Sequence, residues 1–129
     1  MEENTVCTHG FSVTVKTTFI PERSNPSIPV FFFAYYIHIK NDSDEPAKLL
    51  RRRWEITNAF GKTEIVEGDG VVGKQPRLEP GDAHKYTSFC TLPTEFGFME
   101  GQYEMAADNS KIFKISIPLF KLFLPTAVN

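Results

Sequence analysis

Cysteine is scarce in this 129-residue chain, which excludes a small scaffold held together by disulfides. Cys7 and Cys90 are the only two, and they lack the C-x-x-C spacing of a metal or redox motif. The N-terminal stretch MEENTVCTHG is acidic and polar, unlike the basic start and apolar run of a secretory signal. We therefore expect a cytoplasmic protein whose two thiols are reduced.

A charge excess and a long apolar run are also missing. The formal net charge is -2, so the chain has no broad electrostatic attraction for nucleic acid or for an anionic membrane. The longest apolar run, Ile28–Ile37, is much shorter than the roughly 18 residues of a membrane span. We expect neither nucleic acid nor a membrane as a partner.

What the sequence does contain is a succession of strand patterns. Apolar and polar residues alternate over 11–19, as in a strand with one buried face, and residues 30–41 begin apolar on both faces. Gly, Pro or Asn interrupts these patterns about every 8 to 15 residues, and no convincing helix is present. About seven or eight strands predict an all-β antiparallel β-sandwich like those of immunoglobulin and fibronectin type III domains. We expect one domain over residues 1–129, with 1–8 as a flexible N-terminus.

Residues 48–58, KLLRRRWEITN, predict a strand with Leu50, Trp54 and Ile56 on its buried face. Trp54 is expected between the two sheets. In the last strand region, Pro118 removes a main-chain donor and should therefore lie at an edge or in a bulge.

Three consecutive arginines lie in the strand that contains the tryptophan. Arg52 shares the tryptophan's face, so it must lie near the rim of the core or pair with an acid, because a lone buried charge is costly. Arg51 and Arg53 share the other face. Their forked donors could bind a phosphate or carboxylate ligand. The favoured alternative is ion pairing across strands with residues such as Glu64 or Glu67.

The segment Leu78–Tyr86, LEPGDAHKY, resembles the corner of immunoglobulin-like sandwiches. In those domains a Leu-x-Pro-Gly turn precedes a tyrosine whose hydroxyl bonds back to the main chain of the corner. We expect the same role for Tyr86.

Gly68, Gly70 and Gly73 form the G-x-G-x-x-G pattern of dinucleotide-binding loops. That function needs a helix directly after the glycines, with its N-terminus facing the pyrophosphate. Pro76 and Pro80 would lie inside such a helix, where each proline costs about 3 kcal/mol. The favoured interpretation is structural: the glycines supply positive φ or close approach of two backbones.

A helix-free alternative remains for the same glycines. Exposed N–H groups of the loop could form a phosphate nest, assisted by Lys74 and by Arg51 or Arg53. This arrangement would make the protein a binder of nucleotides or polyphosphates.

The sequence contains no catalytic, cofactor or metal motif. The acidic turn with Asp42, Asp44 and Glu45 could hold a divalent cation loosely, but it lacks the glycine and distal glutamate of a calcium loop. We expect no metal site there and no cofactor, and direct metal binding is the weakest functional alternative.

The C-terminal segment holds more apolar residues than one edge strand can bury on one face. These are Leu119, Phe120, Leu122 and Phe123. Surplus apolar area near a sheet edge often marks a contact with a protein partner or a second copy of the chain. A role in the core is the alternative.

Five ordered motifs carry a family resemblance. They are W-x-I-T-N at Trp54–Asn58, the glycine and proline motif at Gly68–Gly81, Y-T-S at Tyr86–Ser88, M-x-G-x-Y at Met99–Tyr103 and I-P-x-F-x-L at Ile117–Leu122. Together they resemble the ApaG family over residues 5–125. Arg53 stands where the family usually has histidine, and Phe89 where glycine is frequent.

The resemblance implies a fibronectin- or immunoglobulin-like sandwich, and it offers no enzymatic activity to transfer. Since the residues show no catalytic motif either, we expect a non-enzymatic protein. Stand-alone bacterial members are associated with cobalt resistance and magnesium efflux, and similar domains of eukaryotic F-box proteins and of a polymerase-interacting protein serve protein recognition. We therefore expect a protein-interaction module with an unidentified protein partner, and a homodimer is a further possibility. Nucleotide or polyphosphate binding remains the main alternative.

Overall fold

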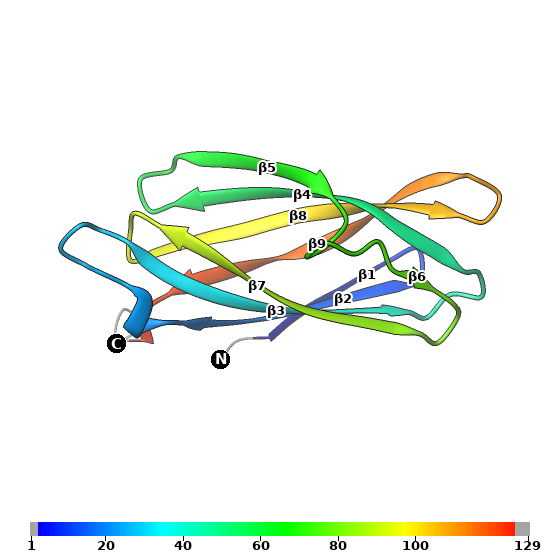
Figure 1. Ribbon diagram of the computed structural model, residues 1–129, viewed down its shortest axis with the longest axis horizontal. Coiled ribbons are helices and arrows are strands. Elements are labelled where there is room, and N and C mark those ends of the chain that lie inside the picture. The colour runs from blue at the N-terminus through cyan, green and yellow to red at the C-terminus, as the bar shows by residue number, and fades with distance from the viewer. Residues whose placement is uncertain (1–2, 126–129) are drawn as a thin grey trace.

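The computed structural model describes residues 3–125, which form a two-layered β-sandwich with one short 3₁₀ turn, η1 (Pro21–Arg23) (Figure 1). The strands are β1 (Glu3–Thr8), β2 (Phe11–Phe19), β3 (Phe31–Asn41), β4 (Ala47–Asn58), β5 (Thr63–Asp69), β6 (Arg77–Leu78), β7 (Ala83–Leu92), β8 (Phe96–Ala107) and β9 (Ile112–Phe123).

Two antiparallel sheets make up the sandwich. The first sheet has the order β1-β2-β3-β7, and the second has the order β5-β4-β8-β9, with the short β6 paired to β4. In Figure 1 the second sheet lies above the first, and β5 is its outermost strand. The prediction of an all-β antiparallel sandwich of the fibronectin type III kind is confirmed.

The N-terminal segment differs from the sequence-based expectation. Residues 3–8 are not a flexible extension but strand β1, which pairs with β2 from Glu3 opposite Lys16 to Thr8 opposite Phe11. His9 and Gly10 form the turn between the two strands, both with positive φ, which is typical of a two-residue hairpin. This strand and the two-residue β6 bring the number of strands to nine within the described residues.

The core lies between the sheets, with Trp54 near its centre. The indole packs edge-on against Tyr35 and Phe120, with ring centroids 5.3 and 5.8 Å away. The predicted buried face of β4 is wrong at one position, because a bulge lies between Leu49 and Arg51. Leu49 is therefore fully buried, and Leu50, predicted to face the core, is only partly covered.

One side of the sandwich is closed by β1, β2 and β9. The Asn4 side chain donates to the carbonyl of Leu119 at 3.1 Å, and the Thr8 hydroxyl accepts a bond from the main-chain N–H of Ser116 at 3.2 Å. Side chains of the first sheet therefore form hydrogen bonds with main-chain groups on the free edge of β9. On the opposite side, β7 and β5 are the edge strands of the two sheets.

Candidate functional site

The glycine motif forms a hairpin turn and not the start of a helix. Val71 and Lys74 exchange main-chain hydrogen bonds of 2.8 and 3.1 Å. Between them, Val72 and Gly73 both have positive φ, 48° and 77°, as in a two-residue turn of type I′. Irregular chain and the short β6 follow, so the prediction that no helix forms across residues 74–81 is confirmed.

At two of the glycines, another part of the chain lies so close that a side chain would not fit. A Cβ at Gly70 would overlap the main-chain carbonyl of Lys74, and the φ of Gly70 is 64°. A Cβ at Gly68 would lie 2.8 Å from a guanidinium nitrogen of Arg52. The structural interpretation of the glycine motif is therefore confirmed: these residues let the loop close on itself and on Arg52.

Arg52 holds the loop from beneath. Its Nη1 donates to the main-chain carbonyls of Asp69 and Gly70, at 3.0 and 2.9 Å. The hydrogen-bond partners of this partly buried guanidinium are thus main-chain oxygens, and not an acidic side chain. This contact joins the strand that carries Trp54 to the turn that carries the glycines.

The other two arginines form ion pairs across strands, and Arg53 also pairs with a residue of its own strand. Arg51 Nη1 contacts Asp69 Oδ1 at 2.5 Å, and Arg53 contacts Glu67 and Glu55 at 3.2 and 3.1 Å. The favoured alternative of cross-strand ion pairing is confirmed for both arginines, with Asp69 and Glu67 as the partners across the strands.

The geometry supplies little for a phosphate nest. The N–H of Gly70 donates to the carbonyl of Leu50 at 2.8 Å, and the N–H groups of Val71 and Lys74 are used within the turn. The loop also directs carbonyls toward the Arg52 guanidinium. A nest presents a row of free N–H groups, whereas three of the donors in residues 68–74 already have protein acceptors.

A pair of tyrosines lies in the interior at the centre of β7 and β8. The hydroxyls of Tyr86 and Tyr103 are 2.5 Å apart. Burial raises the pKa of both phenols well above the usual range, so both stay protonated. The expected bond from Tyr86 to the main chain of its corner is therefore wrong, because the partner of Tyr86 is a side chain of the other sheet.

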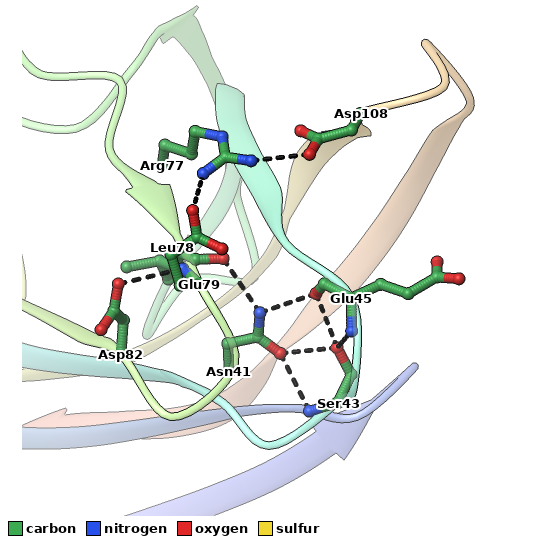
Figure 2. A network of polar contacts seen from close by, with 8 residues as sticks. All are labelled: Asn41, Ser43, Glu45, Arg77, Leu78, Glu79, Asp82 and Asp108. Carbon is green, nitrogen blue, oxygen red and sulfur yellow. Dashed lines mark hydrogen bonds and ion pairs between the residues drawn. The ribbon is translucent and has the colours of Figure 1, made fainter.

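Asn41, and not Tyr86 as expected, bonds to the main chain of the corner (Figure 2). Its fully buried amide donates to the carbonyls of Leu78 and Glu45, at 3.0 and 2.8 Å. Its Oδ1 accepts bonds from the main-chain N–H and the hydroxyl of Ser43. The side chain thus joins the turn after β3 to β6. The missed signal was its position: Asn41 has the same parity as Ile39, on the buried face of β3.

The acidic turn is an ordinary surface turn. Asp42 accepts a bond from the Ser12 hydroxyl at 2.9 Å and pairs with Lys40 at 3.4 Å. The hydroxyl, followed by Lys40, lowers the pKa of this carboxyl. Among residues 3–125, no three His, Cys, Asp or Glu side chains are grouped so that they could hold a metal ion.

The predicted apolar surface at the C-terminal strand is wrong for two of its four residues. Phe120 and Leu122 are fully buried in the core, whereas Leu119 is 47% exposed and Phe123 is partly exposed. The physical reason is a bulge that includes Pro118, opposite the step from Met99 to Gly101. This bulge shifts the alternation of β9, and it also confirms the predicted place of the proline.

Two phenylalanines of β8 extend what remains of that surface. Phe96 lies directly opposite Phe123 in the ladder, and Phe98 lies opposite Lys121. Both are exposed, Phe96 at 54% and Phe98 at 37%. We call Phe96, Phe98, Leu119 and Phe123 the aromatic patch. It lies on the outer face of the second sheet, and Phe96 and Phe98 were not predicted.

Comparison with known proteins decides the family. The sequence profile of the ApaG domain matches residues 21–107. The chain belongs to the ApaG family. Protein ApaG from Anaeromyxobacter dehalogenans is 48% identical over 98% of this chain and 99% of its own length. Protein ApaG from Proteus mirabilis is 44% identical over 92% and 94% of the two chains.

A solved structure extends the similarity to the fold. The protein named ApaA from Bordetella pertussis is 40% identical, with a TM-score of 0.86 over 89% of this chain and 94% of that one. The ApaG fold thus agrees with the sandwich described above. Within residues 3–125, no helix of this ApaG-family chain is long and apolar enough to span a membrane.

The two cysteines of this ApaG domain should differ strongly in reactivity. Cys7 is exposed on β1, and Cys90 is buried on β7, where burial raises its pKa to about 12. We expect Cys7 to react with a disulfide reagent such as DTNB at the rate of a free thiol. Cys90 should react at least about 100-fold more slowly, because it needs local opening. Stopped-flow absorbance at pH 8 measures both phases, and Cys7→Ser should remove only the fast one.

Two fast phases in the native protein would contradict the buried position of Cys90. In denaturant, both thiols should react at one rate, which controls for the chemistry of the reagent.

Proposed function

We propose that this ApaG-family protein is a cytoplasmic, non-enzymatic module that recognises another protein through the aromatic patch. The observation that supports the proposal is the clustering of exposed apolar side chains on two paired strands. Single exposed apolar residues are normal on protein surfaces, whereas a contiguous group often marks an interface.

The patch has the composition of an interface core. Aromatic residues are enriched at such centres, and charged residues surround them. Here Glu100 is next to Phe98 on the same face of β8, whereas Lys121 lies across the ladder from Phe98, between Leu119 and Phe123, and brings one charge into the patch itself. A partner that fits would contribute apolar side chains to the centre of the contact and charged or polar groups to its rim.

The recognition role agrees with the contacts that the three arginines of β4 make beside the glycine motif. Arg52 binds the main chain of the loop, and Arg51 and Arg53 bind carboxylates of the same sheet. These groups support the fold of the domain, which leaves recognition to its faces and edges. From the resemblance to stand-alone bacterial members, we place the module in the cell's response to cobalt and magnesium, where it would act through its partner.

The test compares a patch variant with a matched control in the same strand pair. The variant is Phe96→Ser with Phe98→Ser, and the control is Ile112→Ser, which replaces a 49% exposed side chain at the opposite end of β9. Each tagged protein is used for cross-linked pull-downs with quantitative mass spectrometry. We expect a partner recovered by wild type and the control to fall at least about tenfold with the double variant, because interface aromatics carry much of the binding energy.

The same proteins are then expressed in a bacterial strain that lacks its own ApaG protein. Wild type and Ile112→Ser should restore growth in cobalt, and the double variant should not, although its circular dichroism spectrum is unchanged. Equal recovery of every partner by the double variant would refute the patch as the interface.

A further inference from the structure

The edge of β7 presents a row of unpaired main-chain groups. The N–H of Asn41 donates to the carbonyl of Asp82 at 2.9 Å. Together with the register of the ladder, this bond identifies the residues of β7 that are hydrogen-bonded to β3. Because bonding pairs alternate along an antiparallel ladder, the intervening residues direct their N–H and C=O groups away from β3. These are Ala83, Lys85, Thr87, Phe89 and Thr91. No strand of residues 3–125 pairs with that edge.

Sheet edges usually carry features that prevent pairing with another chain, such as charges, proline or a covering side chain. The edge of β9 is covered by Asn4 and Thr8. The edge strand β5 carries acidic side chains, among them Glu64 and Glu67. The segment 86–92 of β7, YTSFCTL, has no charge and no proline, and Lys85 is the one charged residue of this edge. It is the least protected of these three edges.

There is also room for one more strand beside β7. Val66 and Glu64 of β5 lie opposite Trp54 and Ile56, on the face of the second sheet that points into the sandwich. Both are nevertheless exposed, Val66 at 39%. The first sheet therefore does not cover β5.

A cavity of about 370 Å³ lies in this region. Its walls come from both sheets and from the segments beside them. They include Val30, Ile56, Glu64, Thr91 and Leu92. The cavity lies beside the C-terminal end of β7, and together with the exposed inward face of β5 it marks a space that a fifth strand of the first sheet would fill.

We propose that an extended segment of a partner protein adds to β7 as a fifth strand of the first sheet. Its main chain pairs with the groups of residues 85–91, and every second side chain enters the space between β7 and β5. Main-chain bonds supply affinity in this mode, and the pockets for alternate side chains supply specificity.

The lining predicts the chemistry of the segment. Inward side chains should be aliphatic where they pack on Val66 and Ile56, and polar where they meet Glu64 and Thr91 in the wall of the cavity. Outward side chains lie beside Phe89, which is exposed, and Lys85, which has no ion pair within residues 3–125. An apolar residue and an acidic residue at those outward positions fit best.

A second copy of the chain fits this edge less well than a single extended segment. Pairing β7 with β7 of another copy about a two-fold axis would bring both β5 strands into the same space, because the first sheet of each copy leaves its own β5 uncovered. A lone segment brings no second sheet, so it meets no such obstacle. The surface is also separate from the aromatic patch, which lies on the outer face of the other sheet.

The experiment begins with a displayed library of random 12-residue peptides, selected on the full-length protein. The best peptide is synthesised, and amide hydrogen exchange is measured by NMR with and without it. We expect at least tenfold slower exchange for the amides of Lys85, Thr87 and Phe89 on binding. Those of Tyr86 and Ser88, already bonded to β3, should change little.

Two matched proline variants then identify the edge. Thr87→Pro removes one edge-directed N–H of β7 and leaves the ladder with β3 intact. Ile65→Pro removes one edge-directed N–H of β5 and leaves the ladder with β4 intact. Thr87→Pro should weaken peptide binding at least tenfold, and Ile65→Pro should leave it unchanged. The variant with Phe96→Ser and Phe98→Ser should also bind normally, which separates this surface from the proposed patch.

Selected peptides that bind Thr87→Pro as well as wild type, or that leave the edge amides unprotected, would overturn the proposal. So would a library that returns no binder. Protection of the same amides without peptide, together with a dimer mass in sedimentation, would overturn it in favour of self-association.

Discussion

Replacing Asn41 with alanine is expected to lower the free energy of unfolding by about 3 kcal/mol, a large effect for one polar side chain. The side chain is fully buried and makes four hydrogen bonds, two as donor and two as acceptor. Without it, the carbonyl of Leu78 loses its side-chain donor in the interior, and the turn at Ser43 loses its acceptor. Urea denaturation at pH 7, followed by Trp54 fluorescence, measures the change.

Asn25→Ala is the control for loss of an asparagine from a turn. Asn25 Oδ1 accepts one exposed bond, from the N–H of Ser27. Its replacement should change the free energy of unfolding by no more than about 0.5 kcal/mol. Asn41→Asp keeps both acceptor bonds but turns a carboxylate toward two carbonyls, so it should also destabilise strongly. If Asn41→Ala were as mild as Asn25→Ala, the network in Figure 2 would not be holding the corner.

The Asn41 network also positions the proposed strand-addition edge. The main-chain carbonyl of Asn41 accepts a bond from Gly81, and its N–H donates to Asp82, immediately before β7 begins. One residue therefore fixes the turn after β3, the short β6 and the start of β7. In Asn41→Ala, we expect amide hydrogen exchange to become faster than in wild type, and the increase should be larger at the N-terminal end of β7 than at its centre.

Alternation along the chain was enough to predict the strands, because successive side chains of a strand point to opposite faces. It failed wherever a bulge changed the count. In β4 the bulge after Leu49 exchanged the places of Leu49 and Leu50. In β9 the bulge that includes Pro118 turned Phe120 into the core and left Leu119 outside. Composition does not mark such shifts, although the proline gave one of them a location.

Glycine inside a strand is the second difficulty for sequence-based prediction. Residues Phe96–Gly101 hold two glycines, yet they form the first half of β8. Gly97 is needed there because a Cβ would overlap the main-chain carbonyl of Thr57 on the neighbouring β4. The alternation of Phe96, Gly97 and Phe98 was the available signal for the strand, and it would have placed both phenylalanines on one face. The edge of β7 could not be found from sequence, since strand order depends on the whole topology.

The glycine motif offers the sharpest comparison within one loop. We expect Gly70→Ala to lower the free energy of unfolding by about 3 kcal/mol, because alanine at positive φ costs about 1–2 kcal/mol and its Cβ also overlaps main chain. Gly73 has a similar φ, 77°, but open space where a Cβ would be. Gly73→Ala should therefore cost only about 1 kcal/mol, and Gly73→Asn less, since asparagine tolerates this conformation. Thermal and urea unfolding of the three variants test the order.

That order decides how the motif should be tested for ligands. If Gly70→Ala is far more destabilising than Gly73→Ala, as the contact with Lys74 requires, then loss of any activity in Gly70 variants reports loss of the fold. Lys74→Ala and Gly73→Ala are the informative changes, because they alter the exposed turn and leave the main-chain closure intact. Equal effects at Gly70 and Gly73 would instead show that the loop can relax away from Lys74, and would reopen the backbone of residues 68–73 as a binding surface.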